Sequence, residues 1–381
     1  MNSELLYRPI QMVDVVGQYR RYQDEIDAAV HEVVQSGKYI NGPYVQQFER
    51  AMESYLGVKH AIACASGTDA LQLALMAIDL KPGDEVITTP FTFAATTETI
   101  ALLGGSAVYV DIDSETFNID VEHIESKITP RTRAIMPVHL FGQPANMTRI
   151  GEIARKHNLM VIEDAAQAVG ATWEGMKVCG FGDMAAISFY PSKNLGAFGD
   201  GGMVTTNDDT LAHLVRTIAN HGSERPYYHD RLGVNSRLDA IQAAILSVKL
   251  QYLEEWNEAR SHAASVYTDC FSANSDFIQT PVVDPRAKSI WHQYSIIIPD
   301  GREKVINHLK ESRIPFGIYY PVPLHLQKAY AQGMPGDFPN AEYACNCILS
   351  LPMHSELTRE DAEYIAGHVL ESIEIYETET N

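Results

Sequence analysis

The sequence predicts an α/β protein in which a large domain with a mixed, mostly parallel sheet precedes a smaller α+β domain. Between residues 60 and 220, short apolar runs alternate with helical stretches, as in βα units around a sheet. After Gly233 the alternation stops, and residues 238–271 carry a long helical pattern typical of an interdomain bridge. The 381 residues, 45% hydrophobic, suit two cores. We expect a large domain over 1–240 and the bridge and small domain over 241–381.

Short apolar runs with β-branched and aromatic residues predict the strands of the large domain. They cover residues 61–64, 85–88, 107–110, 133–138, 160–163, 185–190 and 203–206. Helical patterns between them cover residues 68–78, 94–103, 121–127 and 147–156. Because ligands of such sheets bind at the carboxyl ends of the strands, the residues that follow strands are site candidates. Ser66, Asp164 and Lys193 are such residues.

The C-terminal third predicts different elements. Residues 238–271 read as a long helix, kinked or broken once, because they contain few helix breakers. A strand at 291–298, a helix at 303–313, a proline-rich stretch at 319–324 and a helix from 359 to about 376 follow. This mixture predicts the small α+β domain.

Composition excludes several classes of partner. A net charge of −20 argues against nucleic acid, whose phosphates require a basic face. Residues 221–237 hold three arginines and two histidines, which either suit an anionic small molecule or form a chance cluster on a solvated loop. No export signal or membrane span is evident, and five scattered cysteines fit a reducing cytoplasm. Cys345 and Cys347 have a spacing that places their thiols on different helical faces, so no metal site is expected.

Residues 185–204 place one lysine, Lys193, in a glycine-rich loop between two predicted strands. The Walker pattern fails because Ser192 and Asn194 flank the lysine, and the dinucleotide fingerprint fails because the glycines lead into a strand. Two interpretations remain for this residue alone. It is either a solvated loop lysine or an amine that is desolvated and aimed at a carbonyl for Schiff-base chemistry.

Two further motifs have both a structural and a chemical interpretation. Ser66-Gly67-Thr68 lies between a strand and a helix, where it can bind a phosphate or simply cap the helix. Glu163-Asp164 ends an apolar strand. Asp164 can keep a pyridine nitrogen protonated or cap a helix, and Glu163 can be a solvated strand end.

The order of these motifs carries more information than any one of them. The set comprises Ser66-Gly67-Thr68, Phe91-Thr-Phe93-Ala-Ala-Thr96, Glu163-Asp164-Ala-Ala-Gln167, Ser188-Phe-Tyr-Pro-Ser-Lys193, Gly199-Asp-Gly-Gly202 and Gly233-Val-Asn235-Ser-Arg237. Together they resemble the DegT/DnrJ/EryC1/StrS family of nucleotide-sugar aminotransferases, which use pyridoxal 5′-phosphate (PLP). The resemblance runs from about Ile10 to the C-terminal helix. It implies the aspartate aminotransferase-like fold, fold type I, and a homodimer with shared active sites.

The resemblance also implies roles for individual residues. Lys193 would be the Schiff-base lysine, Asp164 the partner of the pyridine nitrogen, Gln167 the partner of the ring hydroxyl, and Phe93 the residue stacked on the ring. The residues that would hold the phosphate are Gly67, Thr68, Ser188 and, from the other subunit, Asn235. Lys193 would then move the proton between the amino donor's α-carbon and C4′ of the cofactor.

For the substrates, the resemblance implies L-glutamate and a nucleotide-linked keto sugar. It points to C3 of UDP-2-acetamido-2-deoxy-3-keto-D-glucuronic acid, on the route to a diamino uronic acid of bacterial surface polysaccharide. Arg237 is the candidate for an anion of this substrate. Tyr319, Tyr320 and His325 are candidates for the sugar pocket, and Tyr319-Tyr320-Pro321 departs from the usual His-Tyr-Pro. A dTDP-linked 6-deoxy-3-keto sugar, a 4-keto sugar and a non-catalytic PLP-binding relative stay open as alternatives.

Overall fold

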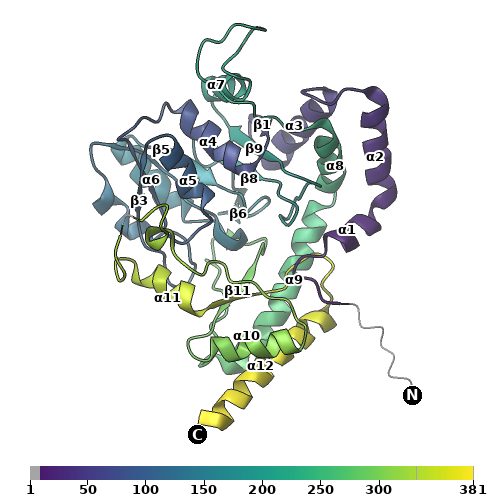
Figure 1. The fold of residues 1–381 in the computed structure, drawn as a ribbon, viewed down its shortest axis with the longest axis vertical. Helices are drawn as coiled ribbons and strands as arrows, with labels where there is room; N and C mark the ends of the chain where they lie inside the picture. The colour runs from purple at the N-terminus through teal and green to yellow at the C-terminus, as the bar shows by residue number, and fades with distance from the viewer. Residues whose placement is uncertain (1–8, 332, 381) are drawn as a thin grey trace.

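The computed structural model describes residues 9–331 and 333–380, and its centre is a seven-stranded sheet (Figure 1). The strands lie in the order β1-β9-β8-β5-β4-β2-β3, and all except β9 run in the same direction. Their bounds are β1 His60–Cys64, β2 Glu85–Thr88, β3 Ser106–Tyr109, β4 Thr132–Ile135, β5 Met160–Asp164, β8 Met184–Ser188 and β9 Gly202–Thr206. The predicted α/β class with a mixed, mostly parallel sheet is confirmed.

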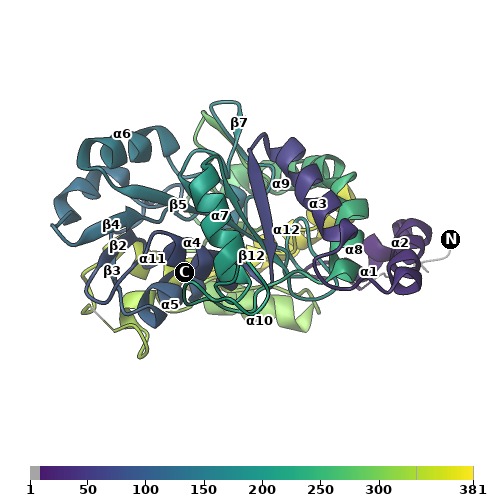
Figure 2. The same ribbon diagram turned by 90° about the horizontal axis from the view of Figure 1, so that it is seen from above.

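Helices cover both faces of this sheet, as the near-continuous apolar strands require. One face packs against α4 (Gly67–Ala77), α5 (Ala95–Leu102) and α7 (Asp209–Ala219). The other packs against α6 (Met147–His157) and a group formed by α2 (Gln23–Ser36), α3 (Pro43–Leu56) and α8 (Ala240–Leu250). Figure 2 shows α5 and α6 on opposite sides of the strands. Alternate residues of one strand therefore enter different cores.

The C-terminal part has its own apolar core around a two-stranded antiparallel sheet. Its strands are β11 (Tyr294–Ile297) and β12 (Ile348–Leu351), which pack with α9 (Leu253–Phe271), α10 (Arg302–Glu311) and α12 (Arg359–Thr380). The predicted long helix is broken once, between α8 and α9. The domain boundary after residue 240 stays a prediction.

Some elements differ from the sequence-based expectation. The predicted helix at 121–127 is two 3₁₀ turns, η1 (Val121–His123) and η2 (Glu125–Lys127). The predicted strand at 133–138 ends at Ile135, before Pro137, which has no N–H to donate to a neighbouring strand. Elements that were not predicted are α1 (Val15–Arg21), α2, α3, α7, α11 (Pro339–Cys347), η3 (Leu140–Gly142), η4 (Ser272–Asn274), η5 (Leu324–Leu326), β6 (Thr172–Trp173), β7 (Met176–Lys177), β10 (Ala287–Lys288) and β12. Within the described ranges, every helix is too short or too polar to cross a membrane.

Candidate active site

A cavity of about 590 Å³ lies at the carboxyl ends of β5 and β8, which is the size of a small-molecule site. It brings together most of the predicted site residues from distant parts of the chain. The predicted residues that line it are Gly67, Thr68, Phe93, Asp164, Gln167, Ser188, Lys193, Tyr319 and Tyr320.

The loop that carries Lys193 is held by backbone hydrogen bonds and a close approach that needs glycine. The Lys193 N–H donates to the Tyr190 carbonyl at 2.8 Å, which closes a turn directly after β8. A Cβ at Gly196 would lie 2.3 Å from the Pro191 carbonyl oxygen, so any other residue there would force the loop apart. The buried Lys249 side chain from α8 donates to the Gly196 carbonyl. The loop therefore holds Lys193 in a defined position.

Lys193 and Asp164 form the ionisable centre of the cavity. Burial lowers the pKa of Lys193 to about 8, and the negative charge of Asp164 opposes this shift. Burial raises the pKa of Asp164, against the hydrogen bond from Thr96 and the charge of Lys193. The Thr96 hydroxyl donates to Asp164 Oδ2 at 2.8 Å, and the Ala166 N–H donates to Oδ1 at 3.2 Å. The cavity therefore contains an amine with a lowered pKa beside a carboxyl group whose orientation is held by two hydrogen bonds.

The start of α4 forms the second end of the cavity, where backbone groups approach closely. Ser66 is the N-cap and accepts from the Asp69 N–H at 3.1 Å, so the capping interpretation of this motif holds. A Cβ at Gly67 would lie 2.6 Å from Cβ of Ser188, and a Cβ at Gly202 only 2.2 Å from the Ser66 carbonyl oxygen. The cap leaves this end of the cavity open to a ligand. Gly67, Thr68 and Ser188 still line the cavity beside the positive end of the helix.

Aromatic side chains form a wall of the cavity. Phe93 is 59% exposed although it is a large apolar residue, so its ring face is available to a ligand. Its ring centroid lies 6.5 Å from that of Tyr320. The Gln167 amide nitrogen donates to the Tyr320 hydroxyl at 3.1 Å, and its oxygen accepts from the Phe141 N–H at 2.7 Å. Gln167 is thereby oriented toward the same space.

The structure adds residues that sequence reasoning missed. Thr96 lies within a quoted motif, and its hydroxyl positions Asp164. Glu163, which the sequence allowed as a solvated strand end, is fully buried. Burial raises its pKa, but a hydrogen bond with His139 Nε2 at 2.9 Å and three backbone N–H groups outweigh this effect and lower it. His139 lies far from Glu163 in sequence, so no local pattern could have revealed this pair.

Three predicted residues lie elsewhere in the chain's own structure. Asn235 is exposed and does not line the cavity. Arg237 lines a separate pocket of about 270 Å³ beside Glu49 and Arg216. His325 is fully buried, bonds to Glu342 at 3.1 Å and lies outside the cavity wall. A single chain therefore assembles the expected cofactor residues except Asn235.

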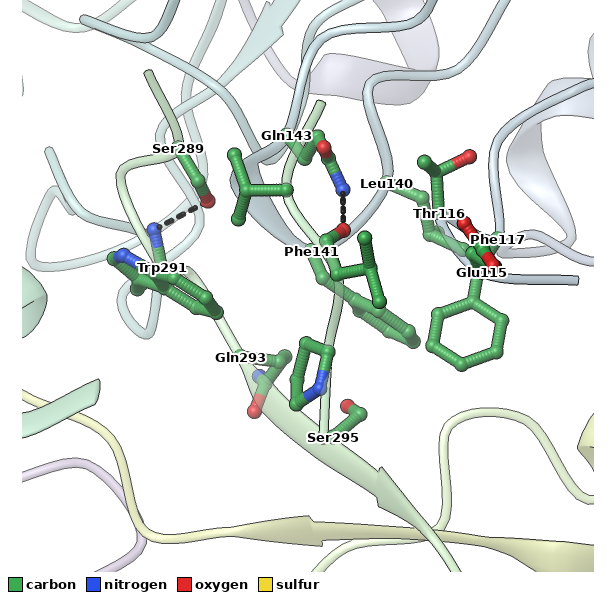
Figure 3. A pocket seen from close by; sticks show the side chains of 13 residues that line it. Glu115, Thr116, Phe117, Leu140, Phe141, Gln143, Ser289, Trp291, Gln293 and Ser295 are labelled. Carbon is green, nitrogen blue, oxygen red and sulfur yellow. Dashed lines mark hydrogen bonds between the residues drawn. The ribbon is translucent and has the colours of Figure 1, made fainter. Parts of the chain in front are cut away.

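A smaller pocket adjoins the active-site wall at Phe141 and Gln293 (Figure 3). Two hydrogen bonds join residues that line it. The Gln143 side-chain amide donates to the Val282 carbonyl at 2.9 Å, and the Trp291 N–H donates to Ser289 Oγ at 3.2 Å. Its volume is only about 20 Å³, room for about one water molecule. An organic cofactor therefore fits the large cavity and not this one.

Curated proteins of similar sequence match almost the full chain. A pleiotropic regulatory protein of Geobacillus stearothermophilus is 47% identical and covers 95% of this chain and 98% of its own length. A UDP-2-acetamido-2-deoxy-3-oxo-D-glucuronate aminotransferase of Pseudomonas aeruginosa is 46% identical, with 94% and 99% covered. A UDP-N-acetyl-3-dehydro-α-D-glucosamine 3-aminotransferase of Acidithiobacillus ferrooxidans is 43% identical, with 94% and 96% covered.

Solved structures of similar sequence share the fold, and some contain the cofactor or an intermediate of it. Streptomyces venezuelae DesV, solved with a reaction intermediate, superposes with a TM-score of 0.93 at 39% identity over 96% of this chain and 98% of its own. Bacillus subtilis NtdA, solved with pyridoxamine phosphate, gives 0.87 at 32% identity over 93% and 82%. A model of the DegT/DnrJ/EryC1/StrS aminotransferase family matches residues 20–370. The resemblance seen in the motifs is confirmed: the chain belongs to this family and is a PLP-dependent aminotransferase.

Proposed function

We propose that the enzyme transfers the amino group of L-glutamate to C3 of UDP-2-acetamido-2-deoxy-3-keto-D-glucuronic acid. The product would be a diamino sugar for bacterial surface polysaccharide, such as the O-antigen of lipopolysaccharide. The observation that carries the reaction type is Lys193 beside Asp164 in one ligand-sized cavity. The proposed sugar substrate is inferred from the relatives that are 46% and 43% identical, which are both named for UDP-linked 3-keto sugars. Five unpaired cysteines support the cytoplasm as the site of action.

The residues of the cavity fit PLP. The phosphate would bind to Thr68, Ser188 and the first N–H groups of α4. The absence of a side chain at Gly67 leaves room there for contact with the backbone. Asp164 would accept from the protonated pyridine nitrogen and Phe93 would cover the ring. Lys193 would hold the cofactor covalently. PLP supplies the electron sink for the carbanion of transamination.

The chain's own groups account for the proton transfers. Because the pKa of Lys193 is about 8, a useful fraction of its amine is neutral near neutral pH. With PLP bound, Lys193 Nζ would take the proton from the donor's α-carbon as a general base and deliver it to C4′ of the cofactor as a general acid. Asp164 stays buried, and the Thr96 hydroxyl holds its orientation. The second half-reaction uses the same groups in reverse with the keto sugar.

A substrate comparison tests this assignment. The PLP-loaded enzyme is incubated with L-glutamate and, in parallel, with UDP-2-acetamido-2-deoxy-3-keto-D-glucuronic acid, its neutral 3-keto-glucosamine analogue, a dTDP-3-keto-6-deoxy sugar and a 4-keto sugar. We expect the highest kcat/KM for the uronic acid, with the new amine at C3 by mass and NMR. Preference for a dTDP sugar or amination at C4 would contradict the substrate. Turnover of none would favour a non-catalytic, regulatory role.

We also propose a homodimer in which Asn235 and Arg237 complete the partner's cavity. The loop after α7 protrudes at the top of Figure 1 and carries Tyr227 and Leu232, which are 94% and 90% exposed. Apolar side chains this open to water are typical of an interface. Asn235 and Arg237 lie outside their own chain's cavity, as a shared site requires. Arg237 would then bind the uronate or the pyrophosphate.

Hybrid dimers test the shared site. Lys193→Ala and the double variant Asn235→Ala/Arg237→Ala are each expected to be nearly inactive. When the two variants are mixed and exchange subunits, about half of the dimers are hybrids, and each hybrid has one intact site of two. The activity should therefore return to about a quarter of that of the wild type. If each chain completes its own cavity, the mixture stays inactive. Light scattering checks that every sample is dimeric.

A further inference from the structure

Three metal-ligating side chains meet on the small domain, away from the cofactor cavity. His308 lies in the last turn of α10, and His368 and Glu371 lie one turn apart on α12. The two helices pack against each other at the bottom of Figure 1. None of the three residues lines the PLP cavity. The cluster is therefore independent of the transamination chemistry.

The separations between the ligand atoms match a tetrahedral metal site. His308 Nε2 lies 3.0 Å from His368 Nδ1 and 3.5 Å from Glu371 Oε2, and the latter two atoms are 3.6 Å apart. Four ligands about 2.05 Å from a zinc ion are about 3.3 Å from one another. A point about 2.1 Å from all three atoms exists roughly 0.8 Å above their plane, close to where a tetrahedral ion would lie. The three atoms are therefore already spaced for one ion.

The chemistry of the cluster favours a cation. Two unprotonated imidazole nitrogens and a carboxylate oxygen repel one another at these distances unless a proton or a metal ion lies between them. The simplest alternative is a hydrogen bond between the two histidines, with Ser312 Oγ 3.3 Å from the same His368 nitrogen. In that alternative a proton on a histidine draws in the Glu371 carboxylate, which is 59% exposed, whereas one metal ion would bind all three atoms at once.

We propose that His308, His368 and Glu371 form a zinc site that fastens α10 to α12. Imidazole and carboxylate ligands suit Zn²⁺, whereas Mg²⁺ and Ca²⁺ prefer oxygen alone. The histidines are about one-fifth exposed, so the ion can enter and a water molecule can take the fourth position. His308 and His368 are 60 residues apart, so the ion closes a long loop and stabilises the small domain.

Zinc binding to the PLP-loaded enzyme tests this proposal. The protein is treated with a chelator, desalted and titrated calorimetrically with Zn²⁺. The wild type should bind one ion per chain and show a higher Tm with zinc. His308→Gln, His368→Gln and the exposed Glu371→Gln should each weaken binding at least about tenfold. Glu371→Gln keeps the test valid if a histidine variant folds poorly.

A matched control separates this cluster from ordinary surface histidines. His213 is exposed and pairs with one carboxylate, Glu224, at 2.8 Å, without a third ligand. His213→Gln should leave the affinity and the stoichiometry unchanged. The proposal is wrong if the wild type binds no zinc, or if His308→Gln/His368→Gln binds it as tightly as the wild type. Aminotransferase activity should persist in every variant, so the outcome is independent of the proposed substrate.

Discussion

Two lysines with lowered pKa values meet at one loop, Lys193 as part of it and Lys249 as a neighbour from α8. Lys193 extends from the loop into the cavity beside Asp164. Lys249, only 2% exposed, reaches the loop from α8, donates to the Gly196 carbonyl and lies 5.2 Å from the centre of the Phe198 ring. Burial lowers the pKa of both, to about 8 for Lys193 and about 7 for Lys249. A lowered lysine pKa therefore does not by itself identify a catalytic amine.

The surroundings of the two amines separate their functions. Lys193 opens onto space for a ligand and faces a carboxylate that can hold a ring nitrogen. Lys249 faces a carbonyl and aromatic rings, and it borders an apolar groove lined by Val16, Phe198 and Ile241. Its amine can hold the loop in place, but it does not line the cavity that contains Asp164. We infer that Lys249 is a positioning residue for Lys193.

The largest expected effect is that of Lys193→Ala. Without its amine, the enzyme loses the general base and the covalent attachment, and kcat should fall by about a thousandfold or more. Steady-state assays with L-glutamate and a keto acceptor measure this loss. Lys249→Met, in the same assay, should retain far more activity. Equal losses in both variants would remove the distinction between the two lysines.

Asp164→Asn should have the next largest effect. The amide cannot keep the pyridine nitrogen protonated, so the electron sink weakens and kcat/KM should fall by about a hundredfold. The Thr96→Val variant, which removes only the hydrogen bond to Asp164, should lose less. A decrease below threefold in Asp164→Asn would show that this carboxylate does not act on the cofactor.

Lys249→Met should change how stability depends on pH. In the folded chain the pKa of Lys249 is about 7, against 10.5 for an ordinary lysine, so between these values only the unfolded chain binds the proton. The free energy of unfolding of the wild type therefore rises with pH relative to the variant. The Tm difference, wild type minus variant, should increase by about 2 °C or more from pH 7.5 to 9.5. The exposed Lys127→Met should show a constant difference.

Phe93→Ala should have the smallest effect. Losing the ring that covers the cofactor removes about 1 kcal/mol, so the Kd for PLP should rise about fivefold. Kcat with saturating PLP should change less. Absorbance titration measures the affinity, and Tyr343→Ala, an exposed aromatic on α11, is the control. An unchanged Kd in Phe93→Ala would place the cofactor ring elsewhere.

The central strands could be predicted because their apolar pattern is local, and the residues proposed to hold the cofactor could be singled out because they lie in short contiguous motifs. Apolar runs reveal β2 and β5, and the motifs around Asp164 and Lys193 are contiguous. Features that depend on tertiary contact were missed. The pair His139–Glu163 joins two elements, and β6 and β10 are two-residue strands defined only by their pairing. The zinc proposal likewise joins histidines that no spacing rule connects, although the sequence suggested no metal.

The most direct test asks which lysine holds the cofactor. Borohydride reduction of the PLP-loaded enzyme fixes the cofactor to its lysine, and peptide mass spectrometry after digestion locates it. The modified peptide should contain Lys193, in the wild type and in Lys249→Met alike. A cofactor found on Lys249, or on no lysine, would contradict the assignment of the active site.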